Sequence, residues 1–129
     1  IVSRQEALGY LPLLDIFVIP SINDGCPNAL LEAMLAGRAL IGSQVDAIGE
    51  ILQHGQNGWL VNPGSADELA AAIQHLASRP ELRTTLGQTA AQTAQIQLAP
   101  AVEFQNWLTV YERVFDTANR FAHPEMTLA

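Results

Sequence analysis

The 129-residue sequence contains no lysine, because all six of its basic residues are arginines. A P-loop, a Schiff-base enzyme and a lysine general base are therefore excluded within this chain. The single cysteine, Cys26, cannot form an internal disulfide and is typical of a reducing compartment. Acidic residues outnumber basic ones by 13 to 6, which gives a net charge of −7. We therefore expect neither nucleic acid nor an anionic membrane surface as a partner of this segment.

Long apolar runs and metal-ligand patterns are also missing. No apolar run approaches the roughly 18 residues of a membrane span, so the sequence predicts no transmembrane helix. The motif D-x-D does not occur, and His54, His75 and His123 lack the spacing of metal ligands, so we expect no metal site and surface histidines. The chain starts with neither Met nor a signal-peptide pattern. We interpret residues 1–129 as a single segment of a longer protein.

Apolar residues make up 49% of the sequence, which predicts a packed core. Three short apolar runs are typical of buried parallel strands, at residues 16–19, 39–43 and 59–61. Helices are predicted around them, over residues 4–14, 27–37, 47–55, 65–79 and 80–95, with another after Pro100. This alternation predicts βαβ units. The expected fold class is α/β, a Rossmann-like parallel sheet of about three strands with flanking helices.

Two further patterns concern the helices. Ser65 and Glu68 fit the S-x-x-E pattern, which predicts a capping box at the start of a helix. The helix after Pro100 carries a stripe at helical spacing, which is more typical of core or interdomain packing than of a sugar platform. Its residues are Phe104, Trp107, Leu108, Tyr111 and Phe115.

The segment PSINDGCPNALLEAM, residues 20–34, is the most informative part of the sequence. A strand ends there, a short polar loop follows, and a helix begins. Ligands of parallel α/β sheets collect at the C-terminal ends of the strands. The free N–H groups of the helix, near residues 28–30, favour an anion such as a diphosphate.

Two carboxylates, Asp24 and Glu32, flank this helix start. A carboxylate is electrostatically unfavourable beside a phosphate, but it accepts hydrogen bonds from neighbouring sugar hydroxyls. A ligand that has both a diphosphate and sugar hydroxyls is a nucleotide sugar. The segment therefore predicts a nucleotide sugar as the partner of this chain.

The stretch VIPSINDGCPNALLEAMLAG resembles the E-x7-E region of GT-B retaining glycosyltransferases of the group 1 type. The resemblance continues through DAIGEILQHGQNGWLVNPGSADELAAAI, PELRTTLG and YERVF, so it covers nearly the whole chain. It implies a partial GT-B fold, the C-terminal part of a donor-binding domain. The implied activity is transfer of a hexosyl group to a sugar or lipid-linked acceptor, without a metal and with the nucleotide-diphosphate sugar as substrate rather than cofactor.

The resemblance implies eight donor-binding residues: Asp24, Gly25, Cys26, Pro27, Asn28, Ala29, Leu30 and Glu32. The first four would face the donor sugar, through the Asp24 side chain and the backbone of residues 25–27. The next three would hold the diphosphate through their amides, and Glu32 would bind the ribose hydroxyls. No side chain is assigned a catalytic role.

The sequence also departs from the family pattern. Asp24 is one methylene shorter than the usual glutamate, and Asp46 and Ala47 stand where the family has a glycine pair. The family's phosphate-binding arginine and lysine and its acceptor domain would lie upstream. We therefore expect the fragment to be inactive alone, to need the missing N-terminal acceptor domain as a partner, and to self-associate through an unpaired strand edge.

Simpler interpretations remain open for several residues. Asp24 fits an Asx turn, Glu32 a solvated helix face, Cys26 an ordinary small residue, and Arg38 either a helix-end charge or a phosphate contact. For the whole chain, the main alternative is a non-catalytic binding or assembly module on a GT-B scaffold, and a nucleotide-sugar epimerase fits less well. The resemblance implies a cytoplasmic location, with a membrane-peripheral one through the missing domain as an alternative.

Overall fold

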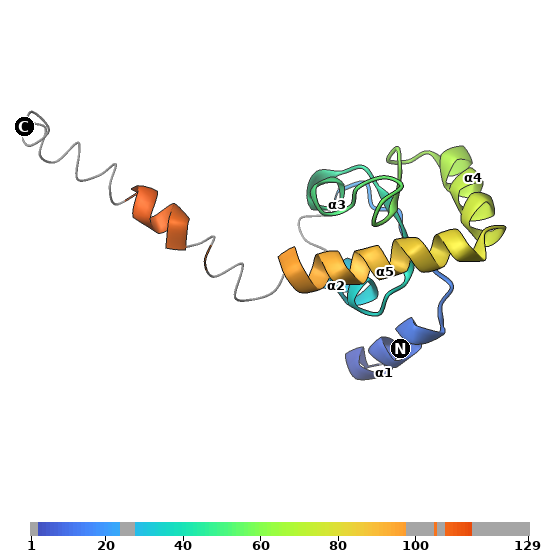
Figure 1. Ribbon diagram of the computed structural model, residues 1–129. Coiled ribbons are helices and arrows are strands. Elements are labelled where there is room, and N and C mark those ends of the chain that lie inside the picture. The colour runs from blue at the N-terminus through green and yellow to red at the C-terminus, as the bar shows by residue number, and fades with distance from the viewer. Residues whose placement is uncertain (1–2, 24–27, 98–104, 106–107, 115–129) are drawn as a thin grey trace, which may run out of the picture. The chain divides into compact units, whose positions relative to one another are not determined.

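The computed structural model describes residues 3–23, 28–97, 105 and 108–114 (Figure 1). The chain divides into two compact units, Ile1–Gln95 and Ile96–Ala129. In the second unit, residues 105 and 108–114 are helical, and Leu108 and Tyr111 are exposed. The rest of the predicted stripe lies outside the described residues, namely Phe104, Trp107 and Phe115.

Three parallel strands form the sheet of the first unit: β1 (Ile16–Ile19), β2 (Ala39–Ser43) and β3 (Trp59–Val61). Their order is β1-β2-β3, so β2 lies in the centre, and all five of its residues are buried. A helix lies between each pair of consecutive strands. The predicted Rossmann-like α/β fold is confirmed, with the bounds of all three strands as expected.

The segment predicted as one helix over residues 4–14 is split near its proline. The helix α1 (Arg4–Tyr10) continues into a 3-10 turn, η1 (Leu11–Leu13), because Pro12 has no N–H to donate to an α-helix. Ser3 and Glu6 form a complete capping box at the start of α1, which the sequence analysis did not identify.

The second helix, α2 (Asn28–Leu35), ends in a glycine turn as predicted. Gly37 has φ +67°, and its N–H donates to the carbonyl of Met34 at 2.9 Å. The next amide, of Arg38, donates to the carbonyl of Ala33 at 3.1 Å. This pair of bonds is a Schellman motif, which satisfies the last carbonyls of the helix.

Three more helices complete the first unit. The helix α3 (Asp46–Ile51) is shorter than the predicted 47–55, because the backbone is already extended at Leu52. The helices α4 (Ala66–Ala77) and α5 (Pro80–Gln97) follow β3. Pro80 occupies the first position of α5, where its missing N–H has no consequence.

The capping box predicted for α4 is only half present. The Glu68 N–H donates to Ser65 Oγ at 3.3 Å, so Ser65 is the N-cap. The Glu68 carboxylate does not turn back to Ser65. It accepts instead from the backbone N–H and the side-chain amide of Asn62, both at 2.8 Å, and these bonds lower the Glu68 pKa.

Both faces of the sheet are packed. One core cluster joins the sheet to α4 and α5, and its buried members are Ala39, Ile41, Val61, Ala72, Leu76 and Leu86. On the other face, Gly42 provides room for α3. A Cβ at Gly42 would lie 2.7 Å from Ile48 Cγ2 and 3.1 Å from Leu52 Cδ1. The small residue at this position therefore sets the close packing of α3 on β2.

The helix α5 crosses the turn between α2 and β2 at two glycines. A Cβ at Gly87 would lie 2.2 Å from the carbonyl oxygen of Gly37, which is a backbone atom that cannot rotate away. The turn and the helix can approach this closely only because Gly87 has no side chain.

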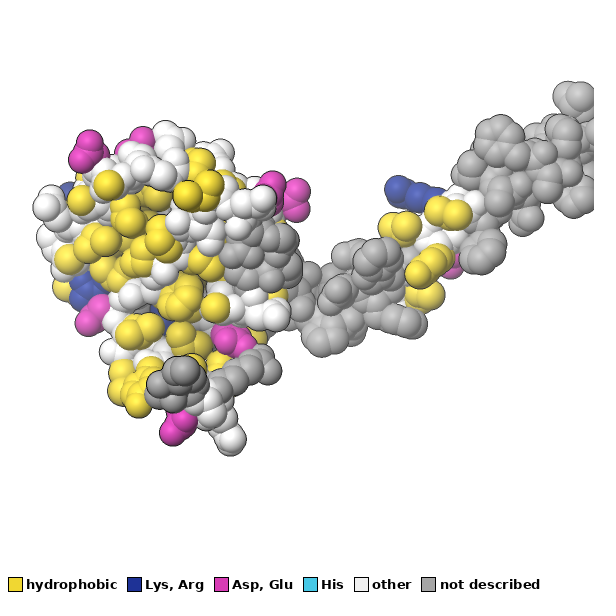
Figure 2. All heavy atoms as spheres, turned by 180° about the vertical axis from the view of Figure 1, so that it is seen from behind, with side chains coloured by type: hydrophobic (Ala, Val, Ile, Leu, Met, Phe, Trp, Pro, Cys, Tyr) yellow, Lys and Arg dark blue, Asp and Glu magenta, His cyan; other side chains and the backbone are white. Residues whose placement is uncertain are grey.

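Hydrophobic side chains gather on one face of the first unit (Figure 2). The exposed apolar residues of this unit include Tyr10, Leu13, Ile22 and Leu35, and Leu13 and Ile22 are 76% and 78% exposed. Among the described residues, β1 pairs with β2 along one edge only. Both features support the prediction of self-association, which stays a prediction.

Candidate functional site

The C-terminal end of β1 leads directly into the segment that the sequence singled out. The strand ends at Ile19, and α2 begins at Asn28 after the intervening loop. Four of the predicted donor residues lie outside the described residues: Asp24, Gly25, Cys26 and Pro27. The other four lie on the first two turns of α2.

The first turn of α2 presents backbone rather than large side chains. Asn28 and Ala29 are exposed, whereas the Leu30 side chain is completely buried in the core. Leu30 can therefore contact a ligand only through its main chain, as its predicted role requires. The first amides of a helix have no partner within the helix and carry a partial positive charge.

Glu32 lies one turn further along α2 and is half-buried. Its neighbours Leu31 and Ala33 are half-buried and buried. The Glu32 side chain is therefore less accessible than a side chain on a fully solvated helix face. Its role toward a ribose stays a prediction.

The turn between β2 and α3 lies at the same end of the sheet and is strained. Asp46 is the only described non-glycine residue with a positive φ, +32°. The N–H of Val45 donates to the carbonyl of Ser43 at 2.9 Å, so the chain reverses tightly before α3. This is the position at which the sequence analysis noted an aspartate in place of a glycine. Strained non-glycine residues are concentrated at functional sites.

A cavity of about 200 Å³ lies beside this turn, at the C-terminal ends of all three strands. Ser43 and Val61 line it from the ends of β2 and β3, and Pro20 lines it from just after β1. Ser65 and Leu69 line it from the start of α4. Ser43 is 1% exposed, and among the described residues its hydroxyl has no hydrogen-bond partner. Sequence analysis missed Ser43, although it is the one hydroxyl residue in the otherwise apolar strand ALIGS.

The opposite end of the sheet is closed by two arginines. Arg38 Nε donates to the carbonyl of Ala36 at 2.8 Å, and its Nη1 donates to the carbonyls of Pro12 and Leu14 at 3.1 and 3.2 Å. These contacts favour the helix-end interpretation of Arg38 over a phosphate contact, although the side chain is half-buried rather than solvated.

Arg83 has a similar role at the end of α4. Its Nη1 donates to the carbonyls of Leu76 and Ala77, both at 2.8 Å, and its Nη2 lies 3.4 Å from Asp15 Oδ1. A cavity of about 380 Å³ lies between Asp15, Arg38 and Arg83. Both guanidinium groups already bind protein carbonyls, so their main task there is to satisfy helix and turn ends.

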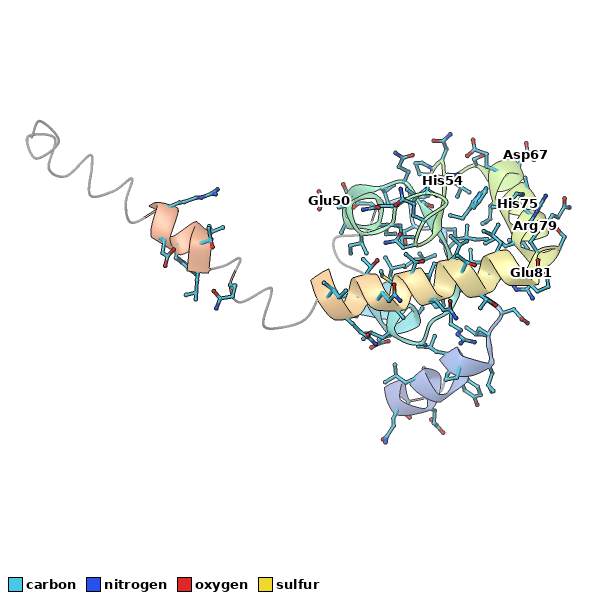
Figure 3. All side chains as sticks on the ribbon, viewed as in Figure 1. Glu50, His54, Asp67, His75, Arg79 and Glu81 are labelled. Carbon is cyan, nitrogen blue, oxygen red and sulfur yellow. The ribbon has the colours of Figure 1, made fainter. Side chains whose placement is uncertain are left out.

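His54 and His75, both labelled in Figure 3, contact the ring of Trp59 on the outer strand β3. The rings of His54 and His75 lie 4.4 and 4.5 Å from that of Trp59. The Leu60 N–H donates to His54 Nδ1 at 3.1 Å, and Arg79 Nη1 lies 2.8 Å from His75 Nδ1. His54 is exposed as predicted, but His75 is half-buried in this ring stack.

No metal site is visible in the part of the chain that the structure describes. There, no three or more His, Cys, Asp or Glu side chains are grouped closely enough to hold an ion. His123 lies outside this part. No described helix is both long enough and apolar enough to cross a bilayer.

Comparisons with known proteins identify the family. A profile of the glycosyl transferases group 1 family matches residues 2–79, which is more than half of the chain. The chain is 31% identical over 112 residues to N,N'-diacetylbacillosaminyl-diphospho-undecaprenol alpha-1,3-N-acetylgalactosaminyltransferase of Campylobacter jejuni. That match covers 87% of this chain and 30% of the relative, so the chain spans about a third of that protein.

Solved structures agree with the fold. The C-terminal domain of the group 1 family glycosyl transferase LpcC from Francisella tularensis is similar with a TM-score of 0.70 and 30% identity. The similarity covers 76% of this chain and 50% of that solved C-terminal domain.

Anabaena HepE in complex with UDP-glucose is similar with a TM-score of 0.65 and 23% identity, over 84% of this chain and 28% of HepE. At that identity the likeness concerns the fold alone. With the family profile spanning the β1–α2 segment and the strands on either side of it, the chain belongs to the glycosyl transferases group 1 family.

Proposed function

We propose that this chain is the C-terminal part of the donor-binding domain of a retaining GT-B glycosyltransferase and that it binds a nucleotide sugar. The family match over residues 2–79 carries the proposal, because it includes the β1–α2 loop and all of α2. The position of α2 supports it, since the helix starts at the C-terminal end of β1, where ligands of parallel sheets bind.

The donor would lie along the start of α2. Amides of Asn28, Ala29 and Leu30 hold the diphosphate, which gains from the unpaired N–H groups and the helix dipole. Glu32, one turn later, accepts hydrogen bonds from the ribose hydroxyls. Asp24, the first carboxylate of the E-x7-E pattern, and the backbone of residues 25–27 face the sugar.

The reaction would be front-face transfer of a hexosyl group with retention of configuration. The departing diphosphate helps to activate a sugar or lipid-linked acceptor, and helix-end amides stabilise the charge that develops on it. No metal is required. The chain spans about a third of its Campylobacter relative, so basic phosphate contacts and an N-terminal acceptor domain come from the rest of the protein. The fragment alone is inactive, and the complete enzyme acts in the cytoplasm.

A non-catalytic binding module on the same scaffold is the second candidate. It is favoured by the departures from the family pattern at Asp24 and at Asp46, which is strained at φ +32°. The two candidates differ in one measurable property. Both bind a nucleotide sugar, but only the enzyme transfers or hydrolyses it.

Ligand-observed NMR on the full-length protein that contains this chain tests the proposal, with UDP-, GDP- and ADP-sugars as probes. Glu32→Gln should weaken binding of the preferred donor about tenfold or more, because hydrogen bonds to a charged group contribute about 1.5–3 kcal/mol. Glu81→Gln is the matched control. Glu81 is an exposed glutamate in the first turn of α5, and its replacement should leave binding unchanged (Figure 3).

The outcomes separate the alternatives. Binding of one nucleotide class that is weakened by Glu32→Gln alone, together with release of free nucleotide on adding an acceptor, supports the transferase. Binding without any transfer or hydrolysis supports the binding module. If none of the three nucleotide sugars binds, the proposed function is wrong. If Glu32→Gln binds as well as the parent, the role of Glu32 is wrong.

A further inference from the structure

Three rings line one cavity of about 300 Å³, whose other walls come from β3 and α4. They belong to His54, Trp59 and His75. The two imidazole rings lie against the Trp59 ring at tilts of 52° and 34°. The rings therefore form a continuous aromatic wall. None of the three lines the cavity at the C-terminal ends of the strands, so this is a separate site.

The hydrogen bonds of the two histidines fix the positions of their ring protons. A backbone N–H can only donate, so His54 Nδ1 accepts from Leu60. A guanidinium can also only donate, so His75 Nδ1 accepts from Arg79. Each neutral imidazole ring therefore carries its proton on Nε2, and this N–H has no partner among the described residues. The indole N–H of Trp59 has no described partner either. The aromatic wall thus leaves three N–H donors for a ligand or for water.

Glu68 adds a hydrogen-bond acceptor to the same cavity. Its two carboxylate oxygens each accept one bond from Asn62, and each oxygen has a further lone pair. Among the described residues no arginine lines the cavity, so the negative charge of Glu68 opposes an anionic ligand. The cavity therefore favours a neutral ligand whose polar groups both donate and accept, as hydroxyl groups do.

A neutral sugar ring combines the properties that this cavity selects. The C–H groups on one face of the ring pack against the negatively polarised face of an aromatic ring. Its hydroxyl groups accept from ring N–H groups and donate to a carboxylate. Ala71 and Ala72 line the cavity from α4 with small side chains, which leave room for such a ring. The volume lies at the small end of ligand sites, which fits one or two sugar units.

We propose that this cavity binds neutral sugar units of a glycan, which stack on the Trp59 ring and bond the Glu68 carboxylate and the ring N–H groups. No described residue of the proposed donor site lines it. The site is therefore an accessory carbohydrate site on the outer strand, additional to the site for a nucleotide sugar. Because the two sites share no described residue, this inference does not rest on the proposed function.

Calorimetric titration of the full-length protein tests the site. The neutral probes are maltotriose, cellotriose and mannotriose, and trigalacturonic acid is the anionic probe. At least one neutral trisaccharide should bind, and trigalacturonic acid should bind more weakly because of Glu68. Trp59→Leu should weaken binding of the neutral trisaccharide about two- to tenfold, since it removes the aromatic face.

Ala71→Leu tests the same cavity without changing the core. Trp59 packs against the core cluster, so its replacement also affects stability. Ala71 instead is an exposed residue of α4 that lines the cavity. Leucine suits a helix and fills part of the cavity, so it should weaken binding at least as much as Trp59→Leu. Ala70→Leu is the matched control, because Ala70 is exposed on α4 but does not line the cavity.

The outcomes separate this site from any other. Binding of a neutral trisaccharide that is weakened by Ala71→Leu and not by Ala70→Leu supports the inference. If none of the neutral probes binds, or if Ala71→Leu binds as well as the parent, the inference is wrong. Tighter binding of trigalacturonic acid than of every neutral probe would also overturn it. The proposed function is tested independently, with nucleotide sugars and Glu32→Gln.

Discussion

The two ends of the parallel strands differ in how their polar groups are satisfied. At the N-terminal ends, Arg38 and Arg83 bind the carbonyls of neighbouring turns and of the end of α4. At the C-terminal ends, the Ser43 hydroxyl has no described partner, Asp46 has a strained backbone, and α3 begins without a side-chain cap. One end is completed by the protein, and the other leaves hydrogen-bond donors for something else.

This difference separates stability from function within one small fold. The completed end supports the sheet through backbone contacts and charge-assisted hydrogen bonds, which rigidify it. The open end has a strained backbone and unsatisfied polar groups. Proteins retain such features at functional sites, where ligand binding offsets their energetic cost. Variants at the completed end should therefore change stability strongly. Variants at the open end should be mild or stabilising, and should act mainly on binding.

The largest effect is expected at the completed end, for Gly87→Ala. The new Cβ would lie 2.2 Å from the Gly37 carbonyl oxygen, so α5 or the α2–β2 turn must shift. We expect a loss of about 3 kcal/mol in the free energy of unfolding, at the upper end of overpacking effects, measured by urea denaturation.

Gly9→Ala provides the matched control for this variant. Gly9 lies within α1, and nothing approaches its Cβ position within 4 Å. Alanine should stabilise the helix there by about 0.5–1 kcal/mol. If Gly87→Ala is as stable as the parent, the gap between α5 and the Gly37 turn is wide enough for a methyl group.

The sequence predicted the sheet well because its strands are short apolar runs between clear turn signals. Residues 16–19, 39–43 and 59–61 are strands with those bounds. The start of α5 at Pro80 and the glycine end of α2 were also predictable, because each depends on one residue with special backbone chemistry. At such positions the local sequence determines the structure, and tertiary contacts do not change it.

Features that depend on long-range contacts were not predictable. The S-x-x-E pattern at Ser65 gave only half a capping box, because the Glu68 carboxylate finds Asn62 in the preceding turn. The unsatisfied hydroxyl of Ser43 depends on which groups surround it in the fold. Among the predicted site residues, the placement of Leu30 and Glu32 on α2 followed from helical spacing. Their ligand contacts stay predictions, as do those of the loop before them.

At the open end, Asp46→Gly should increase stability. Asp46 has φ +32°, which disfavours any residue with a Cβ, and glycine removes that cost. We expect a gain of about 0.5–1 kcal/mol in the free energy of unfolding, because the relief of strain exceeds the extra flexibility of the unfolded chain. Asp46→Ala keeps the Cβ and should show no such gain. A destabilised Asp46→Gly would mean that the carboxylate has a structural role at this turn.

The smallest effect concerns the side-chain cap at the start of α4, which the described residues show at the open end. Hydrogen bonds from the backbone and side chain of Asn62 lower the Glu68 pKa below its ordinary value of 4.5. A group whose pKa is lowered by folding stabilises the protein above its unfolded-state pKa, and this contribution is lost as the pH falls through the folded-state value. The melting temperature of the parent should therefore exceed that of Glu68→Gln at pH 7, and the two should converge toward pH 3.

Asn62→Ala removes the side-chain donor to Glu68 but keeps the backbone donor. Its melting temperature at pH 7 should therefore lie between those of the parent and Glu68→Gln. A gap between the parent and Glu68→Gln that is as large at pH 3 as at pH 7 would show that the Glu68 carboxylate does not hold the start of α4.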